Sequence, residues 1–357
     1  MSKDFLIFSD LHAHNFSYKA KSVVADGCPS MLNSRLVDTL NVLDEIREYA
    51  LRNNISTVVF AGDLFHSRKS VEIDVRHTIS NKIIRFSEDG ITLLMIPGNH
   101  DMGDRYGSLH SLHGLHKIHN IHVFDTVAPH VFTDASGNTF ILVPYSESLE
   151  ATKMAYAEAE FKASTLPGPV FLIGHTGVSG AKVGGDFVLE SESDLTVSDL
   201  PSGFTACFFG HFHEHQELKS GSWYVGATHQ HNWGDSNGKR GFLHVSTESK
   251  LAVKRVETSA PKFIKMTSDC ILEVRPCDFV KVISPVHIDK EALSKDLPGI
   301  DFELVVDKKD EVRSEVTFDS LGDKEVLKTW VESNPDEEVN SSDLLSVGVL
   351  LMDGSYG

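Results

Sequence analysis

The chain has 357 residues, of which 41% are hydrophobic, and it carries 51 acidic against 33 basic side chains, a formal net charge of −18. The hydrophobic content excludes disorder along the whole chain, and no apolar run reaches the roughly 18 residues that a membrane helix needs. The acidity argues against a general basic coat for nucleic acid. Eighteen of the 19 histidines precede residue 245, whereas residues 258–357 hold 10 of the 18 excess negative charges, so the two regions are expected to differ in role.

The chain start and the cysteines suggest a cellular location. The first nine residues hold one lysine and a short apolar run, which is unlike a signal peptide. The four cysteines form no C-x-x-C pair. We therefore expect buried or inert thiols in a reducing cytoplasm.

Over the first 250 residues, short apolar runs alternate with amphipathic stretches, which is the pattern of an α/β fold. The apolar runs predict strands, and the stretches with apolar side chains on one face predict helices. We expect strands at residues 5–8, 57–60, 92–96, 140–143, 170–173 and 206–209, and helices at 35–53, 71–86 and 150–164.

Five of these strands end at side chains that can bind a metal ion, usually beside a glycine. The carboxyl ends of strands in an α/β sheet meet at one edge, so these side chains are expected to lie together. Glycine permits sharp turns and close approach there. The candidate metal ligands are Asp10, His12, Asp63, Asn99, His175, His211 and His213.

This set offers carboxylate, amide and imidazole ligands without a thiolate, which suits Mn²⁺, Fe²⁺ or a catalytic Zn²⁺. Seven ligands are the right number for two ions that share one carboxylate, and Asp63 is the natural shared ligand. Two such ions support hydrolysis of phosphoesters. His100 is expected to protonate the leaving oxygen or to stabilise developing charge, and Asp101 is expected to orient His100.

The other histidines divide into three groups. Those near the motifs, which are His14, His66, His215, His229 and His231, are expected to line the cleft. The series His110, His113, His116, His119 and His122 could form a further metal site, but a polar or substrate-facing surface is the favoured interpretation. The rest are expected at the surface or satisfied in the core: His77, His130, His244 and His287.

The ordered motifs D-x-H, G-D, G-N-H-D, G-H and G-H-x-H resemble those of the calcineurin-like metallophosphoesterases. Within that superfamily the chain is similar to the DNA-repair nucleases of the SbcD and T-even phage recombination endonuclease type. Gly62-Asp63-Leu64-Phe65-His66 resembles that branch, and the G-D-x-V-D-R-G of protein Ser/Thr phosphatases is absent from the sequence. The resemblance is strong over residues 3–257.

The resemblance implies a four-layer α/β sandwich, with two mixed β-sheets flanked by helices, for a nuclease domain at residues 1–257. It implies two Mn²⁺ ions, with Mg²⁺, Fe²⁺ or Zn²⁺ possible. Asp10, His12, Asp63 and His213 would surround one ion, and Asp63, Asn99, His175 and His211 the other, with His100 as the catalytic histidine. The chain departs from the branch in a longer stretch at residues 16–34, and in Gly226-Ala227-Thr228, followed by His229 and His231, where Gly-Ser-Pro is usual.

After residue 257 the pattern changes. Strands are expected at 263–266, 271–274, 279–283, 302–306 and 312–318, with a helix at 289–297. They suggest a small α+β capping domain at residues 258–320, which in the family contacts DNA. Helices at 323–333 and from residue 341 would form a segment, 321–357, that docks on an SbcC-like SMC-family ATPase. Folding of this segment back onto the cap is an equally open alternative.

The resemblance therefore implies a Mn²⁺-dependent DNA nuclease subunit, with double-strand exonuclease and single-strand endonuclease activity, that works in recombination and repair. It would form a homodimer within a heterotetramer with the ATPase. Candidate phosphate contacts are Lys182, Lys239 and Arg240. Two alternatives stay open: a metallophosphoesterase acting on small phosphodiesters or nucleotides, and a non-catalytic scaffold that binds DNA ends.

Overall fold

The computed structural model describes residues 3–24, 31–104, 109–184, 187–191 and 194–306. All of these except Val306 belong to one compact unit, residues 1–305. Two six-stranded mixed sheets form its centre. The predicted segments at 312–318, at 323–333 and from residue 341 lie outside the described residues.

The first sheet has the strand order β16-β15-β1-β4-β5-β6. Its parallel strands are β1 (Phe5–Phe8), β4 (Thr57–Phe60), β5 (Thr92–Met95) and β6 (Ile121–Val123). The antiparallel pair β15 (Gly241–Ser246) and β16 (Ala252–Glu257) completes it beside β1. Both of these last strands escaped the sequence-based prediction. The strands predicted from apolar runs are apolar because helices or the other sheet cover both of their faces.

The second sheet has the order β13-β14-β12-β9-β8-β7. Its central strands β8 (Thr139–Val143), β9 (Val170–His175), β12 (Ala206–Gly210) and β14 (Ser222–Tyr224) are parallel. The edge strands β7 (His130–Thr133) and β13 (Gln216–Lys219) run antiparallel to their neighbours.

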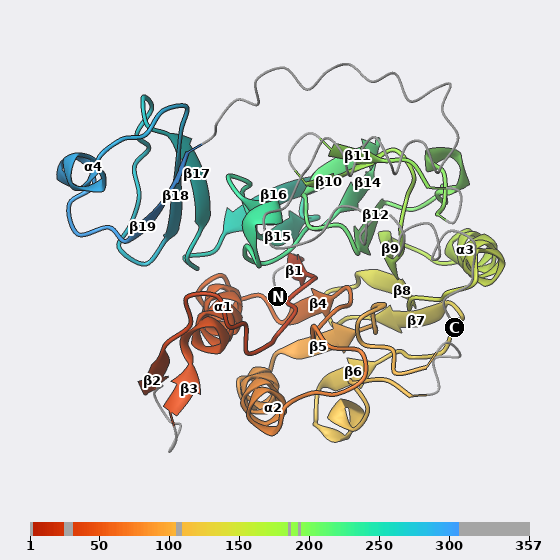
Figure 1. Cartoon of the computed structure of the whole chain (residues 1–357). Helices are drawn as coiled ribbons and strands as arrows, with labels where there is room; N and C mark the ends of the chain where they lie inside the picture. The colour runs from red at the N-terminus through yellow and green to blue at the C-terminus, as the bar shows by residue number, and fades with distance from the viewer. Residues whose placement is uncertain (1–2, 25–30, 105–108, 185–186, 192–193, 307–357) are drawn as a thin grey trace, which may run out of the picture. The chain divides into compact units, whose positions relative to one another are not determined.

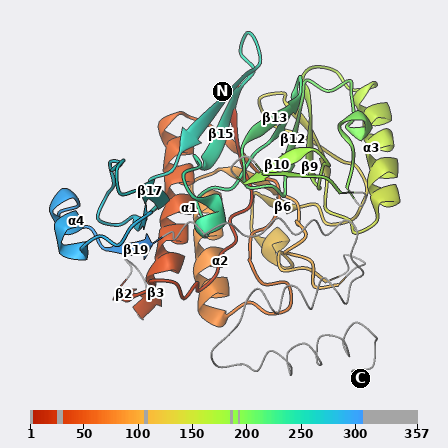
Figure 2. The same ribbon diagram turned by 45° about the horizontal axis from the view of Figure 1, so that its top comes forward.

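Helices cover the outer faces of the two sheets. Helices α1 (Ser34–Arg52) and α2 (Ile73–Glu88) pack on the first sheet, and α3 (Leu149–Ala163) packs on the second, on the opposite side (Figures 1 and 2). Between the sheets lies an aromatic core, in which the ring of Phe5 contacts Phe140 and Phe171 at centroid distances of 5.0 and 4.9 Å. The predicted four-layer sandwich of two mixed sheets is therefore confirmed.

Side-chain caps define where two of these helices begin. Asn33 accepts from Arg35 N ahead of α1, and Ser148 accepts from Ala151 N ahead of α3. The stretch at residues 16–34 contains a short hairpin, β2 (Ser22–Val24) with β3 (Met31–Asn33). A second hairpin joins β10 (Ala181–Gly184) to β11 (Phe187–Leu189). Short 3-10 turns are η1 (Leu115–Lys117), η2 (Val197–Asp199) and η3 (Trp233–Asp235).

Beyond β16 the chain builds a separate sheet with the order β17-β18-β19. It contains β17 (Phe263–Thr267), β18 (Phe279–Ser284) and β19 (Phe302–Val306), with helix α4 (Lys290–Asp296) packed on its own apolar core. The prediction of a strand at 271–274 is wrong. Strands β17 and β18 pair in parallel, so the chain between them must return without pairing, and Ile271 and Leu272 are exposed there.

The structure shows the exposure of three cysteines and the character of the helices. Cys207 is buried, and burial raises the pKa of its thiol to about 12. Cys270 and Cys277 are exposed, so of the expected buried or inert thiols only Cys207 is buried among the three described as free. In the part of the chain that the structure describes, no helix combines the length and apolarity needed to cross a membrane.

Candidate metal centre

The predicted ligands come from the carboxyl ends of five strands, three in the first sheet and two in the second. β1, β4 and β5 precede Asp10, Asp63 and Asn99, while β9 and β12 lead to His175 and His211. The two sheets present these ends side by side: His175 pairs with Gly210 across the second sheet, and the His175 ring reaches Ala61 O after β4. The sequence predicted a single sheet edge, and the structure assembles the site from the edges of two sheets.

A first group of side chains surrounds His12. Its Nε2 lies 3.3 Å from Nε2 of His213, 3.5 Å from Oδ2 of Asp63 and 4.0 Å from Oδ1 of Asp10. Asp10, His12 and His213 form a group that could hold a metal ion. Together with Asp63, they are the four side chains predicted for the first ion.

A second group surrounds His175. Its Nε2 lies 3.6 Å from Oδ2 of Asp63 and 3.0 Å from Oδ1 of Asn99, which is itself 2.9 Å from Nδ1 of His211. Oδ2 of Asp63 thus faces both groups. This is the position that a carboxylate bridging two ions would occupy.

The electrostatics of the cluster fit divalent cations. Burial raises the pKa of Asp10 to about 6 and raises that of Asp63 well above its usual value, with the nearby Asp10 charge adding to the effect. Burial also lowers the pKa of His12 and His175 well below the ordinary value and that of His211 to about 4. The oxygen and nitrogen atoms of these side chains therefore face one another at separations of about 3–4 Å, as ligands do around ions roughly 2 Å away, and a divalent ion would replace the protons that they hold.

Hydrogen bonds on the far side of the rings fix the imidazoles. Nδ1 of His175 lies 2.7 Å from Ala61 O, and Nδ1 of His213 lies 3.1 Å from Oδ1 of Asp235. Each bond places the proton on Nδ1 and leaves the Nε2 lone pair for an ion. The sequence-based prediction missed Asp235, because no motif marks it and only the fold brings it to His213.

The amide of Asn99 lies between the imidazoles and Arg68. With its oxygen toward His175 and His211 it offers a metal ligand. Rotated by 180°, the amide would donate to both rings, and its oxygen would accept from Arg68 Nη2 at 2.7 Å. An ion requires the first orientation, and a site without an ion favours the second. Arg68 also escaped the sequence-based prediction.

His100 lies beside the cluster. Its backbone N–H donates to Oδ1 of Asp63 at 2.8 Å, and its Nδ1 lies 2.6 Å from His66 O. Burial lowers its pKa, and Nε2 remains for proton transfer. Its ring centroid is 4.7 Å from that of His12.

Asp101 has a different role from the predicted one. Its carboxylate accepts from Asp63 N at 2.8 Å, Gly98 N at 3.0 Å and Ser111 Oγ at 2.7 Å. The ring of His100 is held by His66 O instead. Asp101 therefore joins the loops after β4 and β5, where unpaired backbone N–H groups would otherwise be buried.

The ligand loops adopt unusual backbone conformations. Asp10, His12, Asp63 and His211 have φ values of 51°, 46°, 65° and 116°. L-residues seldom adopt positive φ, and such residues cluster at functional sites where the surrounding structure holds them. These four are half of the non-glycine residues with positive φ in the described ranges.

The remaining predicted histidines divide as follows. His66 lies beside His12 with Nδ1 atoms 3.4 Å apart, and Nε2 of His231 lies 3.0 Å from Asp10 O. His110 is buried against Asp125 in a turn, and residues 110–122 continue through η1 into β6, so the series forms no single helical face. Across the described ranges, every group of three side chains able to hold a metal includes His12 or Asp10.

Two of the three predicted phosphate contacts pair with acidic side chains. Arg240 is buried, with Nη1 2.8 Å from Glu214 and Nη2 3.3 Å from Asp235, so its charge is already neutralised and the prediction for it is wrong. Lys239 lies 3.2 Å from Glu257 but is largely exposed.

The relatives of known sequence include two viral proteins. "Putative phosphoesterase 078R" of Invertebrate iridescent virus 3 is 27% identical over 191 residues, which cover 52% of this chain and 51% of that protein. Exonuclease subunit 1 of Enterobacteria phage T4 is 27% identical over 209 residues, which cover 57% of this chain and 56% of that protein. The chain thus spans just over half the length of these relatives.

The similar solved structures include a phosphatase and a nuclease. A dimetal phosphatase from Danio rerio has a TM-score of 0.46 at 11% identity, over 71% of this chain and 96% of that one. The Pseudomonas putida nuclease MPE has a TM-score of 0.24 at 15% identity, over 49% of this chain and 63% of that one.

The profile of one family, the calcineurin-like phosphoesterases, matches residues 3–215. The matched region contains β1, β4, β5, β9 and β12 with the loops that carry the clustered side chains. Because the match covers more than half of the sequence and all five of these strand ends, the chain belongs to the calcineurin-like phosphoesterase family.

Proposed function

We propose that this protein is a Mn²⁺-dependent DNA nuclease subunit, with double-strand exonuclease and single-strand endonuclease activity. Family membership supports hydrolysis of phosphoesters with divalent metal ions. The observation that carries a two-ion mechanism is the position of Asp63, whose Oδ2 faces both groups of candidate ligands. Mg²⁺, Fe²⁺ or Zn²⁺ are alternatives with the same ligand set.

Different residues of the chain would bind the two ions and transfer the proton. Asp10, His12, Asp63 and His213 would hold one ion, and Asp63, Asn99, His175 and His211 the other. When bound, the two ions supply charge that activates water and stabilises the phosphate in the transition state. With its Nδ1–H held by His66 O, His100 would donate from Nε2 to the leaving oxygen as an imidazolium, so the ring would first take up a proton at Nε2.

DNA as the substrate rests on similarity. Exonuclease subunit 1 of phage T4 resembles this chain over just over half of each protein. The motif Gly62 to His66 and the additional sheet β17-β18-β19 also support a nuclease of that branch. We further propose a nuclease domain at 1–257, a capping domain at 258–320 that contacts DNA, and a segment at 321–357 that docks on an SbcC-like SMC-family ATPase. The complex would be a cytoplasmic heterotetramer containing a homodimer of this chain.

A second candidate is a phosphoesterase for small diesters or nucleotides. The relative from the iridescent virus is named a putative phosphoesterase, which supports hydrolysis of phosphoesters without specifying DNA. A non-catalytic DNA-end scaffold is less favoured, because such a protein would be expected to have lost ligands, and all seven are present here.

One comparison tests the proposal. The purified chain is assayed on linear duplex DNA and on bis(p-nitrophenyl) phosphate, with Mn²⁺ and then with EDTA. We expect Mn²⁺-dependent cleavage of DNA that EDTA abolishes. Cleavage of the small diester without cleavage of DNA would favour the second candidate.

A His100→Ala variant tests the mechanism in the same assay. We expect hydrolysis to fall by about 10²- to 10⁴-fold, as for loss of a general acid, while Mn²⁺ binding and DNA binding persist. Cleavage of duplex DNA at the wild-type rate by this variant would contradict the proposed role of His100.

A further inference from the structure

The stretch that departs from the resembled branch lies between the candidate metal centre and the additional sheet. We define residues 228–240, which follow β14 and contain η3, as the bridge segment. Its sequence holds His229, His231 and Asp235, none of which has a role in the proposed reaction. All three are buried, although polar side chains are seldom buried without a structural or functional reason.

On one side the bridge segment contacts the candidate ligands. Oδ1 of Asp235 lies 3.1 Å from Nδ1 of His213, and Oδ2 accepts from His231 N at 2.9 Å. The ring of His231 in turn lies 3.0 Å from Asp10 O through its Nε2. The bridge segment therefore contacts the side chain of one candidate ligand, His213, and the main-chain oxygen of another, Asp10.

On its other side the bridge segment is joined to β17. Asn237 Nδ2 donates to Lys265 O at 3.0 Å, and Lys265 N donates to Oδ1 of Asn237 at 3.0 Å. Asn237 N donates to Phe263 O at 3.1 Å, which makes three bonds from one residue. The ammonium group of Lys281 on β18 lies 4.2 Å from the centroid of the Trp233 ring.

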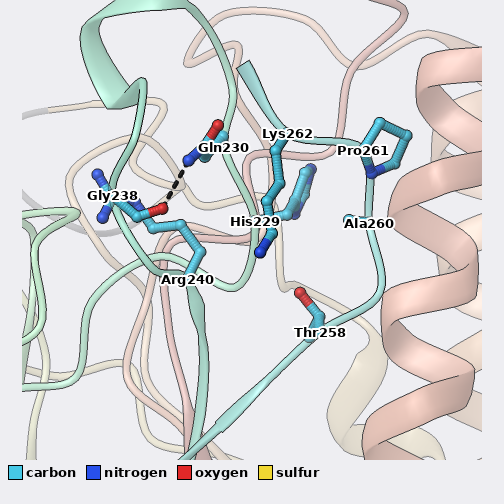
Figure 3. Close-up of a pocket in the computed structure, with 8 residues that line it drawn as sticks. All are labelled: His229, Gln230, Gly238, Arg240, Thr258, Ala260, Pro261 and Lys262. Carbon is cyan, nitrogen blue, oxygen red and sulfur yellow. Dashed lines mark hydrogen bonds between the residues drawn. The ribbon is translucent and has the colours of Figure 1, made fainter. Parts of the chain in front are cut away.

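A small cavity marks where the bridge segment faces the chain that enters β17. The bridge segment contributes His229, Gln230 and Arg240 to its lining. Residues 258–262, which lead into β17, contribute Thr258, Ala260, Pro261 and Lys262 (Figure 3). Gln230 spans the segment: its Nε2 donates to Gly238 O at 2.6 Å, and its Oε1 accepts from Phe263 N. The segment is thus braced both internally and against the additional sheet.

We infer that Asp235 is a positioning residue for His213, and that the bridge segment makes the geometry of the first ion site depend on the docking of β17. A carboxylate on Nδ1 fixes the ring orientation and keeps the Nε2 lone pair available, and loss of such a partner weakens metal affinity by about 10- to 100-fold. Because three bonds fix Asn237 to β17, displacement of that strand would carry Asp235 away from His213. The inference rests on the proposed metal centre.

The first test is a Mn²⁺ titration of full-length Asp235→Asn by calorimetry, with bound Mn²⁺ counted by electron paramagnetic resonance. We expect one of two Mn²⁺ ions to bind about 10- to 100-fold more weakly. The matched control is Asp134→Asn, since Asp134 is also a buried carboxylate but accepts from Asn138 N at 2.9 Å in the turn between β7 and β8 of the second sheet. Equal Mn²⁺ affinity in Asp235→Asn and the wild-type protein overturns the inference, and so does equal weakening in the control.

The second test addresses the coupling to β17. Asn237→Gly removes both side-chain bonds to Lys265, while glycine tolerates the φ of 60° at this position. We expect Mn²⁺ affinity between those of the wild type and Asp235→Asn, and an unchanged affinity would overturn the coupling. If Asp235→Asn does not fold, this variant decides alone. Failure of the wild-type protein to bind Mn²⁺ would instead overturn the proposed function.

Discussion

At the scale of single residues, the partner of Nδ1 fixes the orientation of three histidines of the site. His175 and His213 have Nδ1 engaged by Ala61 O and Asp235, so each presents Nε2 to the candidate ion sites. Nδ1 of His100 is likewise held by His66 O, and the backbone N–H of His100 donates to Oδ1 of Asp63. Because His175 and His100 both have Nδ1 held by a main-chain oxygen, the different roles proposed for them follow from where each ring lies in its loop and not from the partner of Nδ1.

The carboxyl of Asp10 predicts how pH affects stability. Its pKa is raised to about 6, so the folded metal-free protein holds this proton more tightly than the unfolded chain does. This group therefore favours folding at low pH, and its contribution is lost as pH rises from about 4 to about 6. The buried histidines with lowered pKa act in the opposite direction, because the unfolded chain binds protons at these rings more tightly than the folded protein does.

Mn²⁺ must displace the protons of Asp10 and Asp63 to bind, so its affinity increases with pH. We expect the gain in Tm on adding Mn²⁺, relative to EDTA, to be larger at pH 7.5 than at pH 5. Thermal scans at pH 5, 6 and 7.5 with and without Mn²⁺ measure it. A gain that stays constant across this range would contradict a centre built on these carboxylates.

At the scale of elements, the turns that follow the strands determine whether the ligands can converge. Gly62, between β4 and Asp63, has a φ of 98°, and a Cβ there would overlap Nδ1 of His175 and lie 2.8 Å from Cα of Gly98. A Cβ on Gly98 would likewise overlap Oδ1 of Asp63. Such contacts are far inside van der Waals distance, so only glycine lets the two sheet edges approach this closely.

We expect Gly62→Ala to destabilise the protein by at least about 3 kcal/mol, through overpacking in addition to backbone strain, and to abolish Mn²⁺ binding. Gly90→Ala is the matched control, since Gly90 has a φ of 73° but a Cβ there would meet no neighbouring atom within 4 Å. Its cost should be only the strain of about 1–2 kcal/mol. Denaturant unfolding and Mn²⁺ titration of both variants measure the difference, and equal effects would refute steric convergence as the reason for Gly62.

At the scale of the whole described structure, one buried cation joins the sandwich to the additional sheet. Arg35, at the start of α1, donates to His231 O at 3.0 Å. Its guanidinium lies 5.1 Å from the ring centroid of Phe263 on β17 and 4.8 Å from that of Phe279 on β18. Tyr18 reinforces the junction, because its hydroxyl donates to Glu303 at 2.5 Å.

Arg35→Met keeps a long apolar stem but removes the cation–π contacts and the bond to His231 O. We expect a loss of about 2–4 kcal/mol, with faster proteolysis of residues 258–306. Arg52→Met is the control, because Arg52 is exposed at the end of the same helix and bonds Glu48 O at 3.3 Å; it should cost about 0.5 kcal/mol or less. Equal stability of the two variants in urea would show that Arg35 does not hold the junction.

Much of the fold and of the candidate site could be predicted without coordinates. Apolar runs such as 5–8 and 206–209 form strands that are buried on both faces. Burial on both faces requires apolar side chains at consecutive positions, and a short stretch of sequence shows that pattern. The set of candidate ligands followed from strand-end motifs, since topology places such ends together. Strands β15 and β16 and the loop at 271–274 were misjudged, because pairing with a distant or parallel neighbour leaves no local pattern.

By itself, the sequence determined the α/β class and the identity of the clustered side chains, because periodicity and the residue types at strand ends are properties of short segments. Only the tertiary structure decided that two sheets share the site, that Asp235 supports His213, that Asp101 joins two loops and that Arg240 is neutralised. These features depend on contacts between residues far apart in the chain. A pattern within a short segment cannot predict such contacts, because the packing of the whole domain sets the distances between these residues.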